Sequence, residues 1–154
     1  MSSIGMVGWT AYFGAYNVSE LKPEHVVVVS GAAGAVGSIF VQIAKKIVGC
    51  KTVIGIAGGK EKCDWVKSLG ADQCIDYKVS LIVQRSYEKA YVKGGNLEAD
   101  LRRAVPDYAD VYFDNVGGET LDIMLTLVKR YGKVACCGAI SRMSLYTSHD
   151  GANK

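Results

Sequence analysis

Short hydrophobic runs alternate along the chain with stretches of helical spacing, and together they predict strands that alternate with helices. Val26 to Val29 are four consecutive β-branched residues, which is typical of a strand covered on both faces. Further strands are predicted over Thr52 to Ala57, Cys74 to Tyr77, Val111 to Asn115 and Lys133 to Cys137. We expect the Val26 strand to be central in a parallel sheet.

Helical periodicity appears directly after the first strand. Four apolar residues recur at helical spacing and predict an amphipathic helix with Lys45 and Lys46 outside it: Val36, Phe40, Ile43 and Ile47. Helices are also predicted over Lys60 to Leu69, closed by Gly70, over Leu97 to Ala104 and over Glu119 to Arg130. This alternation predicts a Rossmann-type α/β fold, a doubly wound parallel sheet of about five to six strands in three α/β/α layers.

The length of 154 residues predicts one domain with short flanking pieces. Residues 1–20 are interpreted as a lead-in helix or hinge, and residues 21–141 as the Rossmann domain. Residues 79–96 mix basic residues with tyrosines and end in two glycines, so they are predicted to be a flexible insertion. Residues 142–154 are rich in Ser, Thr, Gly and Asn and are predicted to be a disordered tail.

Composition and charge exclude several classes of partner. The chain has 49% hydrophobic and 21% charged residues, as soluble globular proteins do. Its net charge of +3 comes from 18 basic and 15 acidic residues without a basic cluster, so neither nucleic acid nor a membrane surface is an expected partner. No apolar stretch approaches the ~18 residues of a membrane span, and the first residues do not form a signal peptide. We expect a cytoplasmic protein.

The cysteine pattern does not indicate a metal site. Five cysteines occur without a Cys-x-x-Cys pair, and His25 and His149 are the only histidines. This composition disfavours a zinc site. We expect reduced, mostly buried thiols.

Gly34 and Gly37 lie between the first strand and its helix, where ligands bind in such a sheet. Glycine lets backbone N–H groups approach a pyrophosphate at the positive end of the helix. The pattern also suits a glycine turn that serves packing alone. Because a strand and an amphipathic helix flank the glycines, we interpret Gly34, Ala35, Val36 and Gly37 as a dinucleotide site.

The end of the second predicted strand indicates which dinucleotide binds. An NAD site places Asp or Glu there to hold the ribose 2′-hydroxyl, whereas this chain has small residues followed by Lys60 and Lys62. A lysine in that position suits a 2′-phosphate, so we predict NADP. The alternative is that both lysines are only solvated on the first turn of a helix.

Two later strand ends reach the same edge of the sheet. Asn115 and Gly117 follow one strand, and Cys137 and Gly138 end the other. These residues suit contacts to a carboxamide and a flat ring, although Asn115 and Gly117 equally suit a simple turn. The motifs of a Walker loop, a short-chain dehydrogenase and a hydrolase elbow are missing from the sequence.

Several sequence blocks in one order resemble the cofactor domain of the zinc-independent medium-chain dehydrogenase/reductase family, and in particular its leukotriene B4 12-hydroxydehydrogenase and prostaglandin or alkenal reductase branch. The matching blocks are Gly5 to Gly14, Ala33 to Ser38, Lys62, Asp76 to Lys78, Phe113 to Glu119 and Cys137 to Ser141.

The resemblance implies roles for individual residues and a reaction. It places the pyrophosphate at Gly34 to Gly37, the 2′-phosphate or adenosine at Lys62 and Tyr77, and the nicotinamide beside Asn115. The residues that follow the last predicted strand are implied on the nicotinamide side as well: Cys137, Gly138, Ala139, Ile140 and Ser141. In this family NADPH delivers hydride to an α,β-unsaturated aldehyde or ketone and reduces its C=C bond.

The chain also departs from the family pattern. Family members carry an N-terminal barrel-like domain and a C-terminal segment that wall the substrate pocket, and neither matches this sequence. No catalytic residue is therefore assigned. Two hypotheses follow: the NADPH-binding portion of an alkenal or enone reductase acting on a small-molecule substrate, or a non-catalytic dinucleotide-binding or interaction module. Uncovered apolar surface near the lead-in residues favours self-association, such as a homo-oligomer.

Overall fold

The computed structural model describes residues 5–78 and 97–139. The strands are β1 (Val26–Val29), β2 (Thr52–Ala57), β3 (Gln73–Asp76), β4 (Ala109–Asp114) and β5 (Val128–Cys136). The helices are α1 (Met6–Phe13), α2 (Ala35–Gln42), α3 (Lys60–Ser68), α5 (Leu97–Ala104) and α6 (Gly118–Leu125), and the π-helical turns η1 (Gly14–Val18) and η2 (Ile43–Val48) extend α1 and α2. The predicted insertion at 79–96 and the predicted tail at 142–154 lie outside the described residues.

The five strands form one parallel sheet in the order β3-β2-β1-β4-β5. β1 occupies the centre, with Val28 in register with Ile54 of β2 and Tyr112 of β4. Its valines from Val27 to Val29 are fully buried because both faces of the sheet are covered. The predicted central position of this strand is confirmed.

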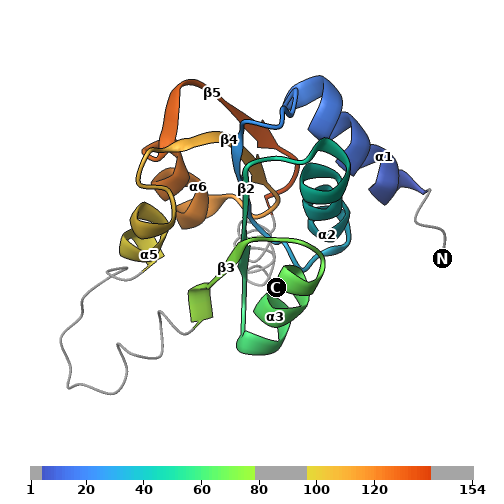
Figure 1. Ribbon diagram of the computed structural model, residues 1–154. Helices are drawn as coiled ribbons and strands as arrows, with labels where there is room; N and C mark the ends of the chain where they lie inside the picture. Colours follow the sequence, from blue (N-terminus) through green and yellow to red (C-terminus); the bar gives the residue numbers. More distant parts are fainter. Residues whose placement is uncertain (1–4, 79–96, 140–154) are drawn as a thin grey trace, which may run out of the picture.

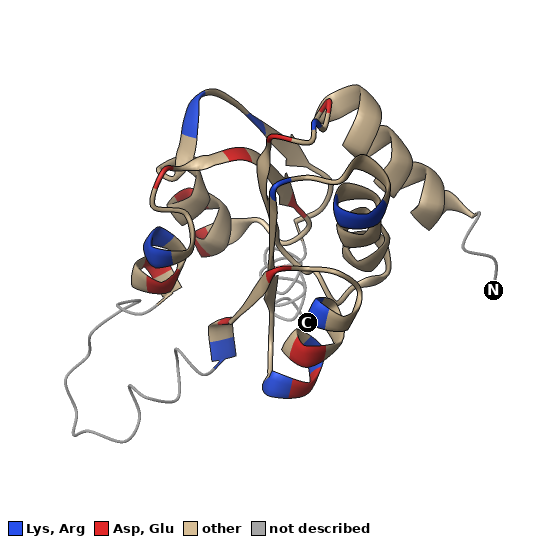
Figure 2. Ribbon diagram, in the orientation of Figure 1, with Lys and Arg blue, Asp and Glu red and all other residues tan. Residues whose placement is uncertain are grey.

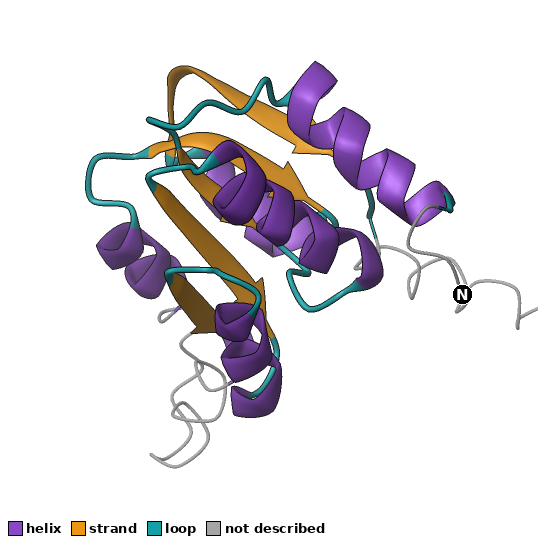
Figure 3. Ribbon diagram, turned by 45° about the vertical axis from the view of Figure 1, so that its right-hand side comes forward, coloured by secondary structure: helices purple, strands orange, loops and turns teal. Residues whose placement is uncertain are grey.

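Helices cover the two faces of the sheet in separate sets, as Figures 1 and 3 show. On one face α1, α2 and α3 pack around a core that includes Ala11, Phe40 and Val66. On the other face α5 and α6 enclose a second core that includes Leu101 and Met124. The predicted three-layer, doubly wound Rossmann-type fold is therefore confirmed.

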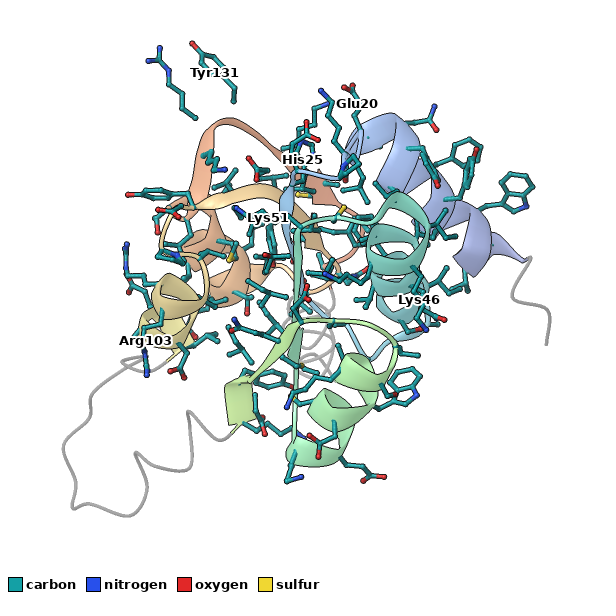
Figure 4. The ribbon with its side chains drawn as sticks, in the orientation of Figure 1. Glu20, His25, Lys46, Lys51, Arg103 and Tyr131 are labelled. Atoms are coloured by element: carbon teal, nitrogen blue, oxygen red, sulfur yellow. The ribbon has the colours of Figure 1, made fainter. Side chains whose placement is uncertain are left out.

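Two predictions about the last helix and strand are wrong. The helix predicted to reach Arg130 ends at Leu125, and the last strand begins at Val128 rather than Lys133. Val128 pairs with Ala109 at the start of β4, and the register then shifts before Lys133 pairs with Val111. The shift is accommodated at Tyr131, which has a positive φ of 67° and projects away from the body in Figure 4. Residues from Val128 to Arg130, which the sequence pattern assigned to the helix, therefore pair as part of β5.

The apolar stripe predicted along the second helix holds only in its first part. Phe40 and Ile43 are buried, but Ile47 is 69% exposed. The α-helical hydrogen bonding changes to π-helical at Ile43, and the wider turn moves Ile47 out of the stripe. From this part of the chain, Val41 and Ala44 are fully buried in the core instead of Ile47.

The segment before β1 contains the helix α1 and packs on the sheet through its small residues. Ala11 and Ala15 are fully buried, and Gly14 lies directly against the Phe113 ring. The helix α1 carries no charged residue, and its ribbon is therefore tan throughout in Figure 2. Its outer side and that of η1 form an apolar surface: Met6, Trp9, Tyr12, Phe13, Tyr16 and Val18. We call these six residues the aromatic face.

The five cysteines are all free. Cys50 and Cys63 are buried and Cys74 is partly buried, but Cys136 and Cys137 are exposed at the end of β5. The expectation of mostly buried thiols is therefore wrong for the last strand, because in the described residues β5 is the edge of the sheet. None of the helices described here is long and apolar enough to cross a membrane.

Candidate functional site

A cleft of about 760 Å³ lies at the carboxyl edge of the sheet. This is the lower end of the sheet in Figure 4, because His25 and Lys51, which directly precede β1 and β2, are labelled near the upper end. The residues that line the cleft come from the ends of all five described strands and the starts of the segments that follow them: Ser30, Gly31, Ala33, Gly34, Ala35, Val36, Gly37, Ile56, Ala57, Gly58, Lys62, Tyr77, Asn115, Val116, Thr120, Cys137 and Gly138.

The turn from β1 into α2 brings bare backbone to the floor of the cleft. Gly34 N donates a hydrogen bond of 2.8 Å to Gly31 O, and Gly34 then begins α2 as its N-cap. A Cβ added at Gly37 would lie 2.4 Å from Gly31 O, so only glycine permits this approach of the helix to the turn. The first N–H groups of the helix lack intrahelical partners and carry its positive end. This geometry suits a phosphate group.

One cation lies at the β2 side of the cleft. Lys62 lines it, and among the described residues Lys62 has neither an ion-pair nor a hydrogen-bond partner. Lys60 instead pairs with Asp64 one turn along α3 and lines a different cavity, between α3 and α5. The two lysines that the sequence left as alternatives are therefore separated by the structure: Lys62 is available to a ligand in the cleft.

Tyr77, directly after β3, lines the same cleft as Lys62. Its ring packs on Gly58, where an added Cβ would lie 2.7 Å from the phenol oxygen. Gly58 thus provides the space that the Tyr77 ring occupies. Together these residues place a cation, a phenol and bare backbone within one subsite.

The opposite end of the cleft is organised by a buried carboxylate. Asp114 is 1% exposed and accepts hydrogen bonds from Ser30 Oγ at 2.8 Å and Tyr112 Oη at 2.7 Å. Gly117 N donates to the same carboxylate at 3.0 Å. Since these donors come from the end of β1, from β4 and from the turn after β4, the Asp114 carboxylate fixes the shape of this edge.

Asn115 is tied to β1 by two hydrogen bonds. Asn115 N donates to Ser30 Oγ at 2.9 Å, and Asn115 Nδ2 donates to Ser30 O at 2.7 Å. The side-chain amide therefore has a structural partner, in keeping with the turn interpretation of this position. The residue nevertheless lines the cleft beside Cys137 and Gly138.

Two groups at this end have perturbed ionisation. Partial desolvation of the Cys137 sulfur, although the residue as a whole is exposed, raises the pKa of its thiol together with the negative charge of Asp114, so the thiol stays protonated at neutral pH. Burial also raises the pKa of Tyr112, and its hydrogen bond to Asp114 adds to the effect while the one with Ser30 opposes it. Both groups therefore remain neutral hydrogen-bonding partners rather than bases.

The structure brings together most of the residues that the sequence predicted as cofactor-binding. The predicted residues that line the cleft are Gly34, Ala35, Val36, Gly37, Lys62, Tyr77, Asn115, Cys137 and Gly138. Ala139 is exposed and is not among the lining residues, and Ile140 and Ser141 lie outside the described residues.

Sequence reasoning missed some lining residues. Ser30 directly follows the valine run, which was a usable signal because strand ends of a parallel sheet meet at the ligand edge. Thr120, in the first turn of α6, gave no such signal.

The comparisons with known proteins agree with this fold. The family model described as zinc-binding dehydrogenase matches residues 35–150. The chain belongs to this dehydrogenase family. In the part that the structure describes, no three His, Cys, Asp or Glu side chains gather in a group that could hold a metal ion.

The curated relatives of the chain are reductases of the medium-chain type, so the resemblance seen in the sequence is confirmed. It is 45% identical over 141 residues to prostaglandin reductase 1 of Bos taurus, which covers 92% of this chain and 38% of the relative. It is 43% identical over 143 residues to the 2-alkenal reductase (NADP(+)-dependent) of Nicotiana tabacum, which covers 92% of this chain and 37% of the relative. The chain thus spans about two-fifths of the length of these relatives.

A solved structure gives the same result for the fold. CurA of Vibrio vulnificus in complex with NADPH superposes with a TM-score of 0.74 at 36% identity and covers 94% of this chain and 42% of that protein. The chain therefore has the fold of one part of an NADPH-bound protein.

Proposed function

We propose that the chain forms the NADP-binding unit of an oxidoreductase that reduces the C=C bond of α,β-unsaturated aldehydes or ketones. The observation that carries the proposal is the cleft at the carboxyl edge, which combines the glycine backbone before α2 with the cation of Lys62, unpaired among the described residues. The names of the relatives, prostaglandin reductase 1 and 2-alkenal reductase (NADP(+)-dependent), support the reaction class.

The cleft fits the cofactor in size and in chemistry. Its volume of about 760 Å³ falls within the range of cofactor sites, roughly 300 to 1,000 Å³. The pyrophosphate would lie on the N–H groups of Gly34 to Gly37, and the 2′-phosphate would lie against Lys62 and Tyr77. A 2′-phosphate needs a cation and no free carboxylate, and this is the arrangement beside Gly58.

The nicotinamide end would lie beside Asn115, Cys137 and Gly138, and the proposal extends to the residues that follow: Ala139, Ile140 and Ser141. An added Cβ at Gly138 would lie 2.8 Å from Asn115 O, so this glycine keeps the end of β5 close to β4. Bound NADPH supplies the hydride, and the chain binds and orients it. The small-molecule enal or enone would contact parts of a longer protein, so no catalytic residue is assigned.

A second candidate is a non-catalytic dinucleotide-binding or interaction module. The observation that favours it is the aromatic face, where Trp9 is 55% and Met6 is 84% exposed. Apolar surface of this kind marks sites of protein association.

Binding and turnover measurements separate these functions. Titrating the 154-residue chain with NADPH and with NADH, followed by nicotinamide fluorescence, should show tighter binding of NADPH. Equal and undetectable responses would remove the cofactor assignment. Enal-dependent oxidation of NADPH, measured by absorbance, distinguishes an active reductase from a module that binds without turnover.

A further inference from the structure

Asp76 lies next to the position where an acid normally decides between NAD and NADP. It ends β3 and is in register with Ala57, the last residue of β2. In NAD sites an acid at the end of the second strand binds the ribose 2′-hydroxyl. Asp76 lies one strand away from that position, at the same carboxyl edge. A carboxylate free to face the ribose here would repel a 2′-phosphate.

The Asp76 side chain is held by the backbone. Its Oδ1 accepts a hydrogen bond of 2.8 Å from Gly59 N and another of 2.9 Å from Lys78 N. The first bond joins β3 to the turn that enters α3. The second holds the backbone directly after Tyr77. Asp76 therefore joins the two segments that carry the 2′-phosphate subsite, one with Lys62 and the other with Tyr77.

The hydrogen bond from Gly59 N to Asp76 restrains an unusual backbone conformation. Gly59 is the N-cap of α3 and has φ of 101° and ψ of 147°, a conformation that side chains rarely allow. A flexible glycine pair at 58 and 59 would otherwise sample many conformations. The hydrogen bond from Gly59 N to Asp76 selects one of them, and in it Gly58 lies under the Tyr77 ring.

We propose that Asp76 is a positioning residue for NADP specificity, which holds the Gly58–Gly59 turn and Tyr77 so that Lys62 and the phenol face a 2′-phosphate. This inference rests on the proposed cofactor. It reverses the role that an acid at this edge has in NAD sites, because here the carboxylate binds backbone N–H groups and supports recognition of an anion.

The test compares two probes that differ only in the 2′-phosphate, adenosine 2′,5′-bisphosphate and adenosine 5′-monophosphate. Isothermal titration of the 154-residue chain gives their affinity ratio. We expect wild type to prefer the bisphosphate. Asp76→Ala should lower the ratio by roughly tenfold, because a charge-assisted contact is misplaced. Asp76→Asn retains an acceptor oxygen and should keep the ratio close to that of wild type.

A matched control lies at the other end of the same strand pair. Asp72 Oδ2 accepts a hydrogen bond of 2.7 Å from Val53 N, so it also ties β3 to β2, but it does not line the cleft. Asp72→Ala should lower stability and leave the affinity ratio unchanged. A purely structural role for Asp76 would make the two alanine variants alike in this ratio.

The outcomes separate the inference from the proposed function. Wild type that binds neither probe overturns the proposed function. Wild type that prefers the bisphosphate, with an unchanged ratio in Asp76→Ala, overturns only the inference. A ratio that rises in Asp76→Ala and Asp76→Asn also overturns it, since the carboxylate would then act by repelling the phosphate.

A second variant decides the question if Asp76→Ala does not fold. Gly58→Ala keeps Asp76 but adds a Cβ that would lie 2.7 Å from the Tyr77 phenol oxygen, and it must therefore displace that ring. The affinity ratio should fall in this variant as well. An unchanged ratio in a folded Gly58→Ala protein would show that the position of Tyr77 does not matter and would reject the proposal.

Discussion

Ser30 Oγ donates a buried hydrogen bond of 2.8 Å to Asp114 Oδ1 and joins the carboxyl ends of β1 and β4. The same hydroxyl accepts from Asn115 N at 2.9 Å, so one side chain connects a carboxylate with the turn that follows it. Both Ser30 and Asp114 are at most 1% exposed. Buried polar groups of this kind are costly to leave without partners.

Replacing Ser30 with Ala should therefore destabilise the chain. The variant deprives the Asp114 carboxylate of a donor and Asn115 N of its acceptor. We expect the free energy of unfolding to fall by about 1 to 3 kcal/mol, measured by urea denaturation. Ser68→Ala is the matched control, because Ser68 is exposed and bonds only within α3, and it should change the value by less than about 0.5 kcal/mol. Similar effects from both variants would contradict a special role for the buried hydroxyl.

Gly37→Ala should be harmful even without a bound cofactor. The added Cβ would lie 2.4 Å from Gly31 O and 2.9 Å from the Ala32 Cα, so backbone must move. Such overpacking costs about 1 to 3 kcal/mol, which thermal unfolding would report as a lower Tm. Gly34→Ala is the graded comparison, since its Cβ would meet Gly31 O at 3.1 Å, and its loss should be smaller. The reverse order of the two variants would mean that α2 is not packed as described.

Much of the fold follows from local patterns in the sequence. A run of β-branched residues at Val26 to Val29 determines a doubly covered strand, and a glycine turn followed by an amphipathic stripe determines the first helix. Because parallel strands end at one edge, the predicted site residues had to meet there. The edge of the cleft was therefore predictable from spacing alone.

Other features depend on contacts between distant parts of the chain. Because Val128 pairs with Ala109, β5 begins earlier than the sequence predicted, and no local pattern specifies that partner. The contact of Ser30 with Asp114 spans 84 positions. The residue pattern by itself also left Lys60 and Lys62 as alternatives, although the family resemblance favoured Lys62, and the structure separates them because only Lys62 lines the cleft.

Stability at acidic pH should depend on Asp110 at the start of β4. Burial acts to raise the pKa of Asp110, but hydrogen bonds from Lys129 Nζ and Val26 N outweigh it and leave the pKa below its usual value. Because the pKa is lower in the folded state, the Asp110 carboxylate stabilises the fold at pH values above its unfolded-state pKa of ~3.9. This stabilisation is lost as the pH falls through the folded-state pKa.

Asp110→Asn should therefore be less stable than wild type at neutral pH, by about 1 kcal/mol or less because solvent screens the pair. The two proteins should converge in urea denaturation as the pH falls below about 4. Asp64→Asn, which alters a surface ion pair on α3, serves as the control and should track wild type. A difference between Asp110→Asn and wild type that stays constant down to low pH would refute the ionic origin of the effect.

The aromatic face should make the isolated chain associate with itself. Trp9 and Phe13 stack on its outer side with ring centroids 5.6 Å apart and are 55% and 49% exposed. We expect the mass measured by light scattering to rise with concentration, and the double variant Trp9→Ser/Phe13→Ser to reduce this rise. Trp65→Ser removes an exposed aromatic residue from α3 and should have no effect. A sharp monomer for wild type at every concentration would count against association through this surface.

Lys62→Ala should selectively weaken the binding of NADPH, and Lys60→Ala should not. The two lysines lie two residues apart on α3, so they share charge and sequence neighbourhood, but only Lys62 lines the cleft. Losing a charge-assisted contact to the 2′-phosphate should cost about 1.5 to 3 kcal/mol, which corresponds to roughly tenfold to a hundredfold in Kd for NADPH. The Kd for NADH should stay constant in both variants, because NADH lacks this phosphate. Fluorescence titration of the three proteins measures these constants in parallel. An equal loss for NADPH in the two variants would indicate a diffuse effect of positive charge, whereas a loss confined to Lys60→Ala would move the 2′-phosphate site to the other side of α3.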